Sequence, residues 1–215
     1  GAAVTFPPGG IFRGTGALVL LDRKRPNQFI LAEDVAQAMS LWYRDGRQYP
    51  VSLMGAVALI RQTLLDTQWY EEAWTKFRQA GPGQAAPETN PALAALCPCV
   101  RKDRPVVMQV ADELDILRVS KIAQEFGVEM WVLGTGYEYR RLAAIKETGL
   151  RLIVPVNFPK APDVSCLEQE LRVSLDQLRH WDFAPENPAR LAQGGVDFVL
   201  TTAGLRTKAE FLANM

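Results

Sequence analysis

The segment PVVMQVADELDI, residues 105–116, joins a short apolar run to the start of a helical pattern. PVVMQV, residues 105–110, is continuous in apolar residues, as expected of a strand that is buried on both faces. Residues 112–126 then carry apolar residues at helical spacing, with Asp112 suited to cap the first turn and Gly127 suited to end the helix. Gln109 therefore falls at the carboxyl end of a buried strand, just before a helix.

The same alternation continues to the end of the chain. Further strands are predicted over residues 128–133, 150–156 and 196–202, and helices over residues 137–148, 166–180 and 185–193. Strands that are continuous in apolar residues and alternate with helices favour parallel pairing with both faces of the sheet covered. The pattern predicts an α/β fold.

The first half of the chain is less regular. Residues 17–21 and 28–32 are predicted strands, and PPGGIFRGTG, residues 7–16, is a predicted glycine-rich turn. A long helix is predicted from Ser52 to Gly81, followed by an exposed loop over residues 81–91. Neither side of this loop looks self-sufficient, so we expect residues 1–215 to form a single domain.

Composition excludes several classes of function. Lysine plus arginine equals aspartate plus glutamate, at 24 each, so no bulk charge favours nucleic acid or an anionic membrane as a partner. No apolar run reaches the roughly 18 residues that a membrane span needs. We therefore expect a soluble protein without a nucleic-acid or membrane partner, and its cellular compartment stays unknown.

Histidine and cysteine are scarce. His180 is the only histidine, so a Ser-His-Asp or Cys-His catalytic group would have to centre on it. Its place at the end of an apolar helix favours a packing or helix-end role instead. Cys97-Pro-Cys99 could hold zinc only with carboxylates or a partner chain, and two ordinary helix-end cysteines are the simpler interpretation.

Polar side chains follow the predicted strands at their carboxyl ends, where parallel α/β folds bind ligands. The catalytic residues stay unknown, but a candidate pocket follows from this rule: Gln109, Glu113, Tyr137, Glu138, Asn157, Lys160 and Thr202. Simpler roles exist for some neighbours, since Asp112 suits a helix cap and Glu138 suits a helix N-terminus. GTG occurs at 14–16 and at 134–136, but neither copy completes the G-x-G-x-x-G pattern of dinucleotide sites.

Three longer segments carry a resemblance to a known family. They are YPVSLMGAVALIRQTLLDTQWY (49–70), residues 104–164, and residues 178–215, which include APENPARLAQGGVDFVLTT. Together they resemble the barrel segment of large bacterial amidohydrolase-family proteins, in the imidazolonepropionase and prolidase-like branch. The resemblance implies a partial (β/α)8 TIM-type barrel, with parallel strands and outer helices, from a metal-dependent hydrolase.

The metal ligands that the family uses do not transfer to this sequence. The resemblance implies an H-x-H after the first barrel strand, histidines after the fifth and sixth, and an aspartate after the eighth. Here those last three positions fall at Gln109, near Leu133-Gly134, and at Ala203, and the chain contains no H-x-H. We therefore assign no metal site and no cofactor to this chain, while zinc or another divalent metal is expected in a hydrolytic full-length parent.

Truncation and divergence both explain the missing ligands. Truncation accounts for the first strands, and divergence accounts for Gln109, Gly134 and Ala203, which lie inside the chain. Three functions stay open. The first is a segment of a hydrolase of C–N bonds in amides or cyclic amides, inactive in isolation. The second is a catalytically inactive barrel that binds a small molecule or another partner, and the third is an unrelated open-sheet protein that binds a phosphate or nucleotide.

A partial barrel would leave strand edges and apolar surface uncovered. We therefore expect a homodimer or strand exchange, which light scattering would test. The expected ligand is a small molecule, and the family resemblance implies a bacterial cytoplasmic or periplasmic protein.

Overall fold

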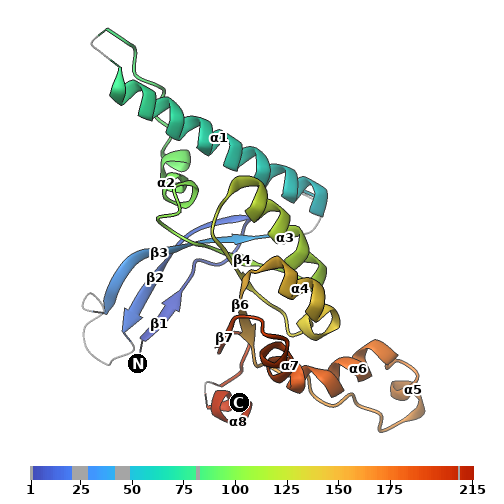
Figure 1. The fold of residues 1–215 in the computed structure, drawn as a ribbon. Coiled ribbons are helices and arrows are strands. Elements are labelled where there is room, and N and C mark those ends of the chain that lie inside the picture. The colour runs from blue at the N-terminus through green and yellow to red at the C-terminus, as the bar shows by residue number, and fades with distance from the viewer. Residues whose placement is uncertain (1, 21–28, 42–48, 81–82, 208) are drawn as a thin grey trace. The chain divides into compact units, whose positions relative to one another are not determined.

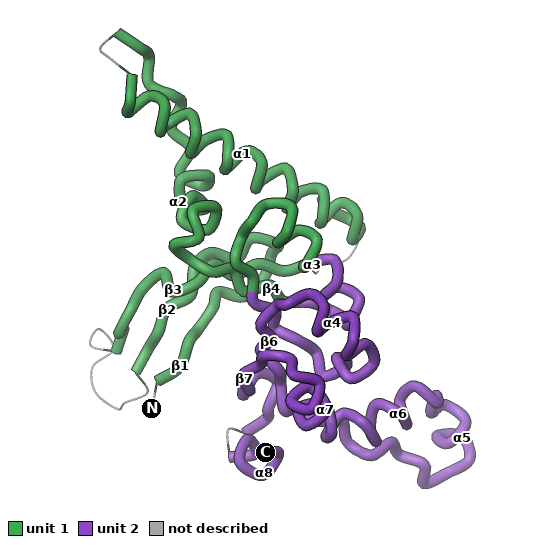
Figure 2. The backbone as a smooth tube through the Cα atoms, in the orientation of Figure 1, with its two compact units in different colours: residues 1–109, 119–130 green, residues 110–118, 131–215 purple. Residues whose placement is uncertain are grey.

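The computed structural model describes residues 2–20, 29–41, 49–80, 83–207 and 209–215. Seven strands are hydrogen-bonded in chain order, from β1 to β7. The chain divides into two compact units, residues 1–109 with 119–130 and residues 110–118 with 131–215 (Figure 2).

The first unit begins with three antiparallel strands: β1 Ala2–Thr5, β2 Phe12–Leu20 and β3 Ile30–Ser40 (Figure 1). β4, Val106–Gln109, then pairs with β3 in parallel, with Gln37 opposite Val106 and Ser40 opposite Gln109. The predicted turn at 7–16 is wrong at its second half, because residues 12–16 belong to β2. Glycine at position 16 allows β2 to pass close to the ring of Phe6, because a Cβ at this position would overlap that ring.

Helices α1, Leu53–Gln79, and α2, Pro91–Val100, pack against each other in the first unit (Figure 1). Ser52 caps α1 by accepting a hydrogen bond from the Gly55 N–H at 3.1 Å, as the sequence predicts. α2 was not predicted, and Asn90 starts it by capping the N–H groups of two following residues. In the predicted loop, residues 83–90 contain no helix or strand. Residues 81–82 of that loop, and residues 21 and 28 of the two predicted strands, lie outside the described residues.

Helix α3, Glu113–Phe126, follows β4 as predicted, and the Asp112 carboxylate accepts the Asp115 N–H at 2.8 Å. Gly127 follows the helix at φ +63°, a left-handed conformation that glycine adopts without steric cost. Buried apolar side chains of β4 and α3, such as Val106, Met108 and Ile122, contribute to the core of the first unit.

The second unit contains the predicted parallel βα succession. β5 Met130–Leu133, β6 Arg151–Pro155 and β7 Phe198–Thr201 pair in parallel, with Leu152 opposite Phe198. Its α-helices are α4 Leu142–Thr148, α5 Leu167–Glu170, α6 Leu175–Phe183, α7 Asn187–Gly194 and α8 Glu210–Ala213, and its 3-10 turns are η2 Glu138–Arg141 and η3 Ala184–Glu186. The predicted α/β class with a mostly parallel sheet is confirmed.

Two predicted helices differ from the observed ones for local reasons. The helix predicted over 166–180 is broken into α5 and α6, because Ser174 forms a capping box with Gln177 and starts a new helix there. The helix predicted over 137–148 starts as the 3-10 turn η2. Its first residue, Glu138, accepts hydrogen bonds from the preceding loop instead of continuing a regular helix.

Candidate functional site

Gln109 lies at the end of β4 in the first unit, and its side chain accepts a hydrogen bond from an arginine. Arg13 Nη1 of β2 donates to the Gln109 Oε1 at 2.5 Å, and the Gln109 carbonyl accepts the Leu41 N–H at 3.1 Å. Burial lowers the pKa of Arg13 from its usual value. Sequence reasoning missed Arg13 because it lies in the stretch that was predicted as a turn.

Glu138 is fully buried in the second unit and serves the loop that follows β5. Its Oε1 accepts the Thr135 N–H at 2.7 Å and the Gly136 N–H at 3.2 Å, and its Oε2 accepts the Asn187 Nδ2–H at 2.7 Å. A Cβ at Gly134 would overlap Oε1, so the glycine makes room for the carboxylate. Glu138 therefore holds a turn together, and Asn187, its partner at the start of α7, was not singled out from the sequence.

An aromatic and cationic stack lies beside this loop. The rings of Tyr137 and His180 stack with their centroids 3.6 Å apart and an interplanar angle of 14°. The Arg140 guanidinium lies 4.3 Å from the Tyr137 centroid, and its Nη2 donates to Asp176 at 2.6 Å. Glu113 is weakly paired with the same arginine, with 4.0 Å between Oε1 and Nη1.

The two stacked rings titrate differently from their free counterparts. Burial, followed by the positive charge of Arg140, lowers the pKa of His180 below its usual value. Burial raises the pKa of Tyr137, although the nearby Arg140 acts in the opposite direction. At neutral pH both rings therefore face their surroundings as uncharged groups.

A cavity of about 490 Å³ opens beside the stack, within the second unit. Ten residues from the loop after β5, the loop after β6 and the α5–α6 segment line it: Tyr137, Pro159, Lys160, Pro162, Asp163, Gln169, Arg172, Val173, Gln177 and His180. The structure thus brings two of the predicted pocket residues together, Tyr137 and Lys160. It adds His180 and Arg172, which strand-end reasoning did not include because they lie on or between helices.

The remaining predicted pocket residues do not line this cavity. Glu138 is turned toward its own loop, and Glu113 contacts Arg140. The Asn157 side chain lies against Gly204, where a Cβ would overlap its amide. The Thr202 carbonyl accepts the Leu205 N–H at 3.3 Å.

The strand ends described here do not fit the zinc centre that the family resemblance implies. Zinc sites use imidazole, thiolate or carboxylate ligands. Gln109 offers an amide that already pairs with Arg13, Gly134 has no side chain, and Ala203 has only a methyl group. The neighbouring carboxylate, Glu138, is held by three N–H donors.

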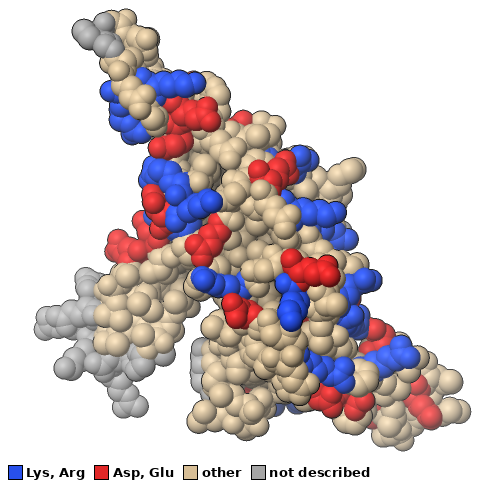
Figure 3. Space-filling view, in the orientation of Figure 1, with Lys and Arg blue, Asp and Glu red and all other residues tan. Residues whose placement is uncertain are grey.

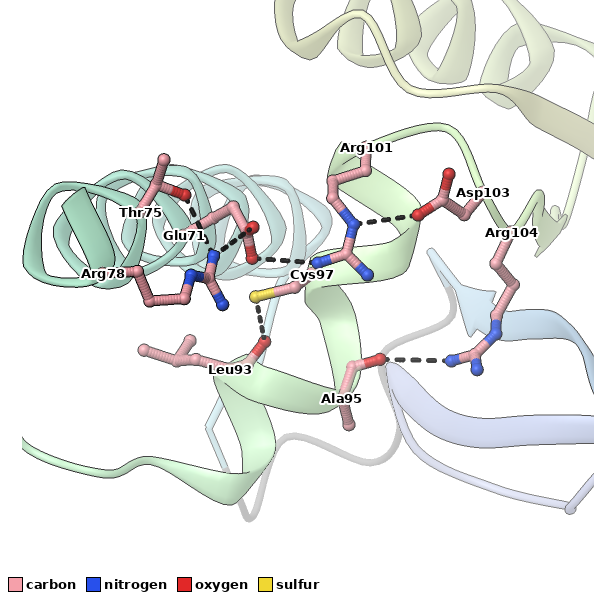
Figure 4. A network of polar contacts seen from close by, with 9 residues as sticks. All are labelled: Glu71, Thr75, Arg78, Leu93, Ala95, Cys97, Arg101, Asp103 and Arg104. Atoms are coloured by element: carbon pink, nitrogen blue, oxygen red, sulfur yellow. Dashed lines mark hydrogen bonds and ion pairs between the residues drawn. The ribbon is translucent and has the colours of Figure 1, made fainter.

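Cys97 and Cys99 are buried in α2 of the first unit. Burial, together with the nearby Glu71 carboxylate, raises the pKa of Cys97 to about 11, and burial raises that of Cys99 to about 11. Figure 4 shows Arg101 beside Cys97, paired with Glu71 at 3.1 Å, and Cys97 Sγ donating to the Leu93 carbonyl at 3.4 Å. Among the described residues, no three His, Cys, Asp or Glu side chains cluster as metal ligands.

Acidic and basic side chains are interspersed over the face of the molecule seen in Figure 3, consistent with the balanced charge of the chain. Of the helices in the described ranges, none combines the length and the apolar character that crossing a membrane requires.

Comparison with known proteins identifies a fold relative. Neither a family model nor a curated protein sequence matches this chain. The crystal structure of an amidohydrolase from Thermotoga maritima MSB8 is similar, with a TM-score of 0.75 and 19% sequence identity. The match covers 95% of this chain and 51% of that chain, so the present chain spans about half of its relative's length. The fold is therefore similar to that of part of the Thermotoga protein, and the α/β half-sheet is consistent with part of a TIM-type barrel.

Proposed function

We propose that this chain is the ligand-binding part of an amidohydrolase-like barrel, and that the cavity beside Tyr137 and His180 holds a small polar molecule. The cavity itself is the observation that carries the proposal. Its volume of about 490 Å³ suits a small-molecule site, and loops that follow two parallel strands contribute to its lining. In barrel folds such loops at the carboxyl ends of strands form the active site.

The lining chemistry supports the binding of a small polar ligand. His180 and Tyr137 present uncharged rings, and the buried carboxylate that follows Tyr137 in the chain, Glu138, is engaged in hydrogen bonds with its own loop and with Asn187. Recognition therefore rests on the rings and on the polar groups around them.

The test is a fragment screen by ¹H–¹⁵N NMR on the 215-residue chain. We expect polar fragments to shift the backbone signals of Tyr137, Lys160 and His180, while signals of α1 stay in place. A matched variant, Tyr137→Ala, removes one ring of the stack and should weaken the same fragments. A screen in which no fragment moves these signals would refute the proposal.

A second candidate is hydrolysis of C–N bonds in amides or cyclic amides, favoured by the similarity in fold to the Thermotoga amidohydrolase. In this case residues outside the present segment supply the metal ligands, and the isolated chain is inactive. Elemental analysis and amide hydrolysis assays, with and without added zinc, on a full-length protein that contains this segment separate the two candidates. Stoichiometric zinc together with zinc-dependent turnover would favour the second.

A further inference from the structure

We infer that the cavity beside Tyr137 and His180 selects a flat organic anion, such as an aromatic carboxylate. This inference rests on the proposed function and specifies the class of ligand. It depends on two features of the cavity wall: cationic side chains without a partner, and a planar aromatic surface next to them.

The cations are Lys160 and Arg172. Both are exposed at the cavity, and neither side chain forms an ion pair or hydrogen bond with any residue that the structure describes. Arg140, by contrast, is already paired with Asp176 at 2.6 Å. The positive charge of the wall is therefore available to a ligand.

One carboxylate, Asp163, also lines the cavity, so the two cations leave a net positive wall. Asp163 Oδ1 accepts the Ser165 N–H at 3.0 Å, and this bond lowers the pKa of Asp163. The acid is thus held by its own loop and remains ionised. Two cations against one carboxylate disfavour a cationic ligand.

The flat part of the ligand is suggested by the rings. Tyr137 and His180 both belong to the wall, where their rings stack against each other at 14° and the Arg140 guanidinium lies 4.3 Å from the Tyr137 centroid, so the ring edges and the remaining ring surface are what a ligand can contact. Pro159, Pro162 and Val173 add apolar surface around them. Aromatic edges and prolines contact the faces of planar rings well, whereas a small inorganic anion would use the cations alone.

The experiment is an NMR titration of the chain at fixed ionic strength with benzoate, benzamide and inorganic phosphate. Benzoate and benzamide have nearly the same shape and differ in charge, and phosphate has charge without a ring. We expect benzoate to bind at least about fivefold more tightly than benzamide or phosphate. This ratio corresponds to one contact between opposite charges in a solvent-exposed site.

Lys160→Gln and Arg172→Gln should each weaken benzoate binding by about fivefold and leave benzamide unchanged. Both side chains are exposed, so the variants are expected to fold. Lys121→Gln, at an exposed position of α3 outside the cavity, removes the same charge and should change neither Kd.

The outcomes separate this inference from the proposed function. Equal affinity for benzoate and benzamide, or loss of benzoate affinity in none of the cavity variants, overturns the anion inference but leaves the binding function standing. Phosphate binding as tightly as benzoate overturns the requirement for a flat group. Failure of all three probes to move the cavity signals counts against both proposals.

Discussion

Replacing Glu138 by alanine is expected to destabilise the chain by about 2–6 kcal/mol. The carboxylate accepts hydrogen bonds from Thr135 N–H, Gly136 N–H and Asn187 Nδ2–H, at 2.7, 3.2 and 2.7 Å. Asn187 is 1% exposed, so leaving its Nδ2–H group without a hydrogen-bond acceptor costs about 1–3 kcal/mol. The two loop N–H groups are only partly buried and water can reach them, so each costs about 0.5–1.5 kcal/mol.

The matched variant Glu138→Gln tests whether hydrogen bonding, and not volume, sets this cost. The Asn187 Oδ1 is buried without a partner among the described residues. A rotation of the Asn187 amide can therefore present this oxygen to the NH₂ group that the substitution introduces, while the new carbonyl accepts the loop N–H groups. We expect a loss of only about 1 kcal/mol.

Urea denaturation followed by circular dichroism measures both variants, with Glu147→Ala as the control on the exposed surface of α4. The control should stay within about 0.5 kcal/mol of the parent chain. The reasoning fails if Glu138→Ala also stays within 1 kcal/mol. It fails equally if the glutamine and alanine variants are destabilised to the same extent.

Three further results are expected. Gly134→Ala should lower the free energy of unfolding by about 1–3 kcal/mol in urea denaturation, because its Cβ would overlap the Glu138 carboxylate. The control Gly194→Ala places its Cβ at an ordinary contact distance and should be neutral. Equal effects of the two substitutions would contradict the steric explanation. The single histidine allows an unambiguous NMR titration, in which the pKa of His180 should lie below 6.5. The contribution of the neutral ring to the free energy of unfolding is then complete above pH 6.5 and is lost as pH falls from 6.5 through the pKa of the folded state; a midpoint above 6.5 would be inconsistent with burial. A thiol reagent should label Cys166 rapidly and the two buried cysteines of α2 only on unfolding, and rapid labelling of all three would show that α2 opens readily.

The second half of the fold could be predicted because its signals are local. An apolar run such as residues 105–110 and the helical spacing after it are visible in a window of about a dozen residues. The caps Asp112 and Gly127 were found in the same manner, and the structure confirms both.

The antiparallel strands of the first unit could not be predicted in the same way. β3 runs to Ser40 through Glu33, Asp34 and Gln37, which are poor strand signals by themselves. Gln37 is nevertheless buried, because its Nε2 donates to the carbonyls of Gly14 and Ala38 at 3.0 and 3.2 Å. The strand exists because of its pairing partners, and these are not adjacent in the sequence.

The candidate site was predictable in its location and less so in its members. The strand-end rule found Tyr137 and Lys160, which line the described cavity. It placed Glu138 among pocket residues, whereas the alternative interpretation, a carboxylate that serves the local backbone, matches the observed hydrogen bonds. His180 and Arg172 were absent from the prediction because their approach to Tyr137 depends on how α6 and the segment before it pack.

Gly134 and Glu138 form one structural feature, although the sequence shows them as two. In the family that this chain resembles, a histidine would stand near position 134, and the glycine alone suggests a simple loss of that ligand. The space beside Gly134 is instead filled by the Glu138 carboxylate, on which the loop N–H groups and Asn187 depend. Gly134→His would therefore displace a buried carboxylate before any metal could bind. Restoring a ligand at this strand end requires compensating changes at Glu138 and Asn187 as well, because the Glu138 carboxylate fills the space beside Gly134 and is hydrogen-bonded to Asn187.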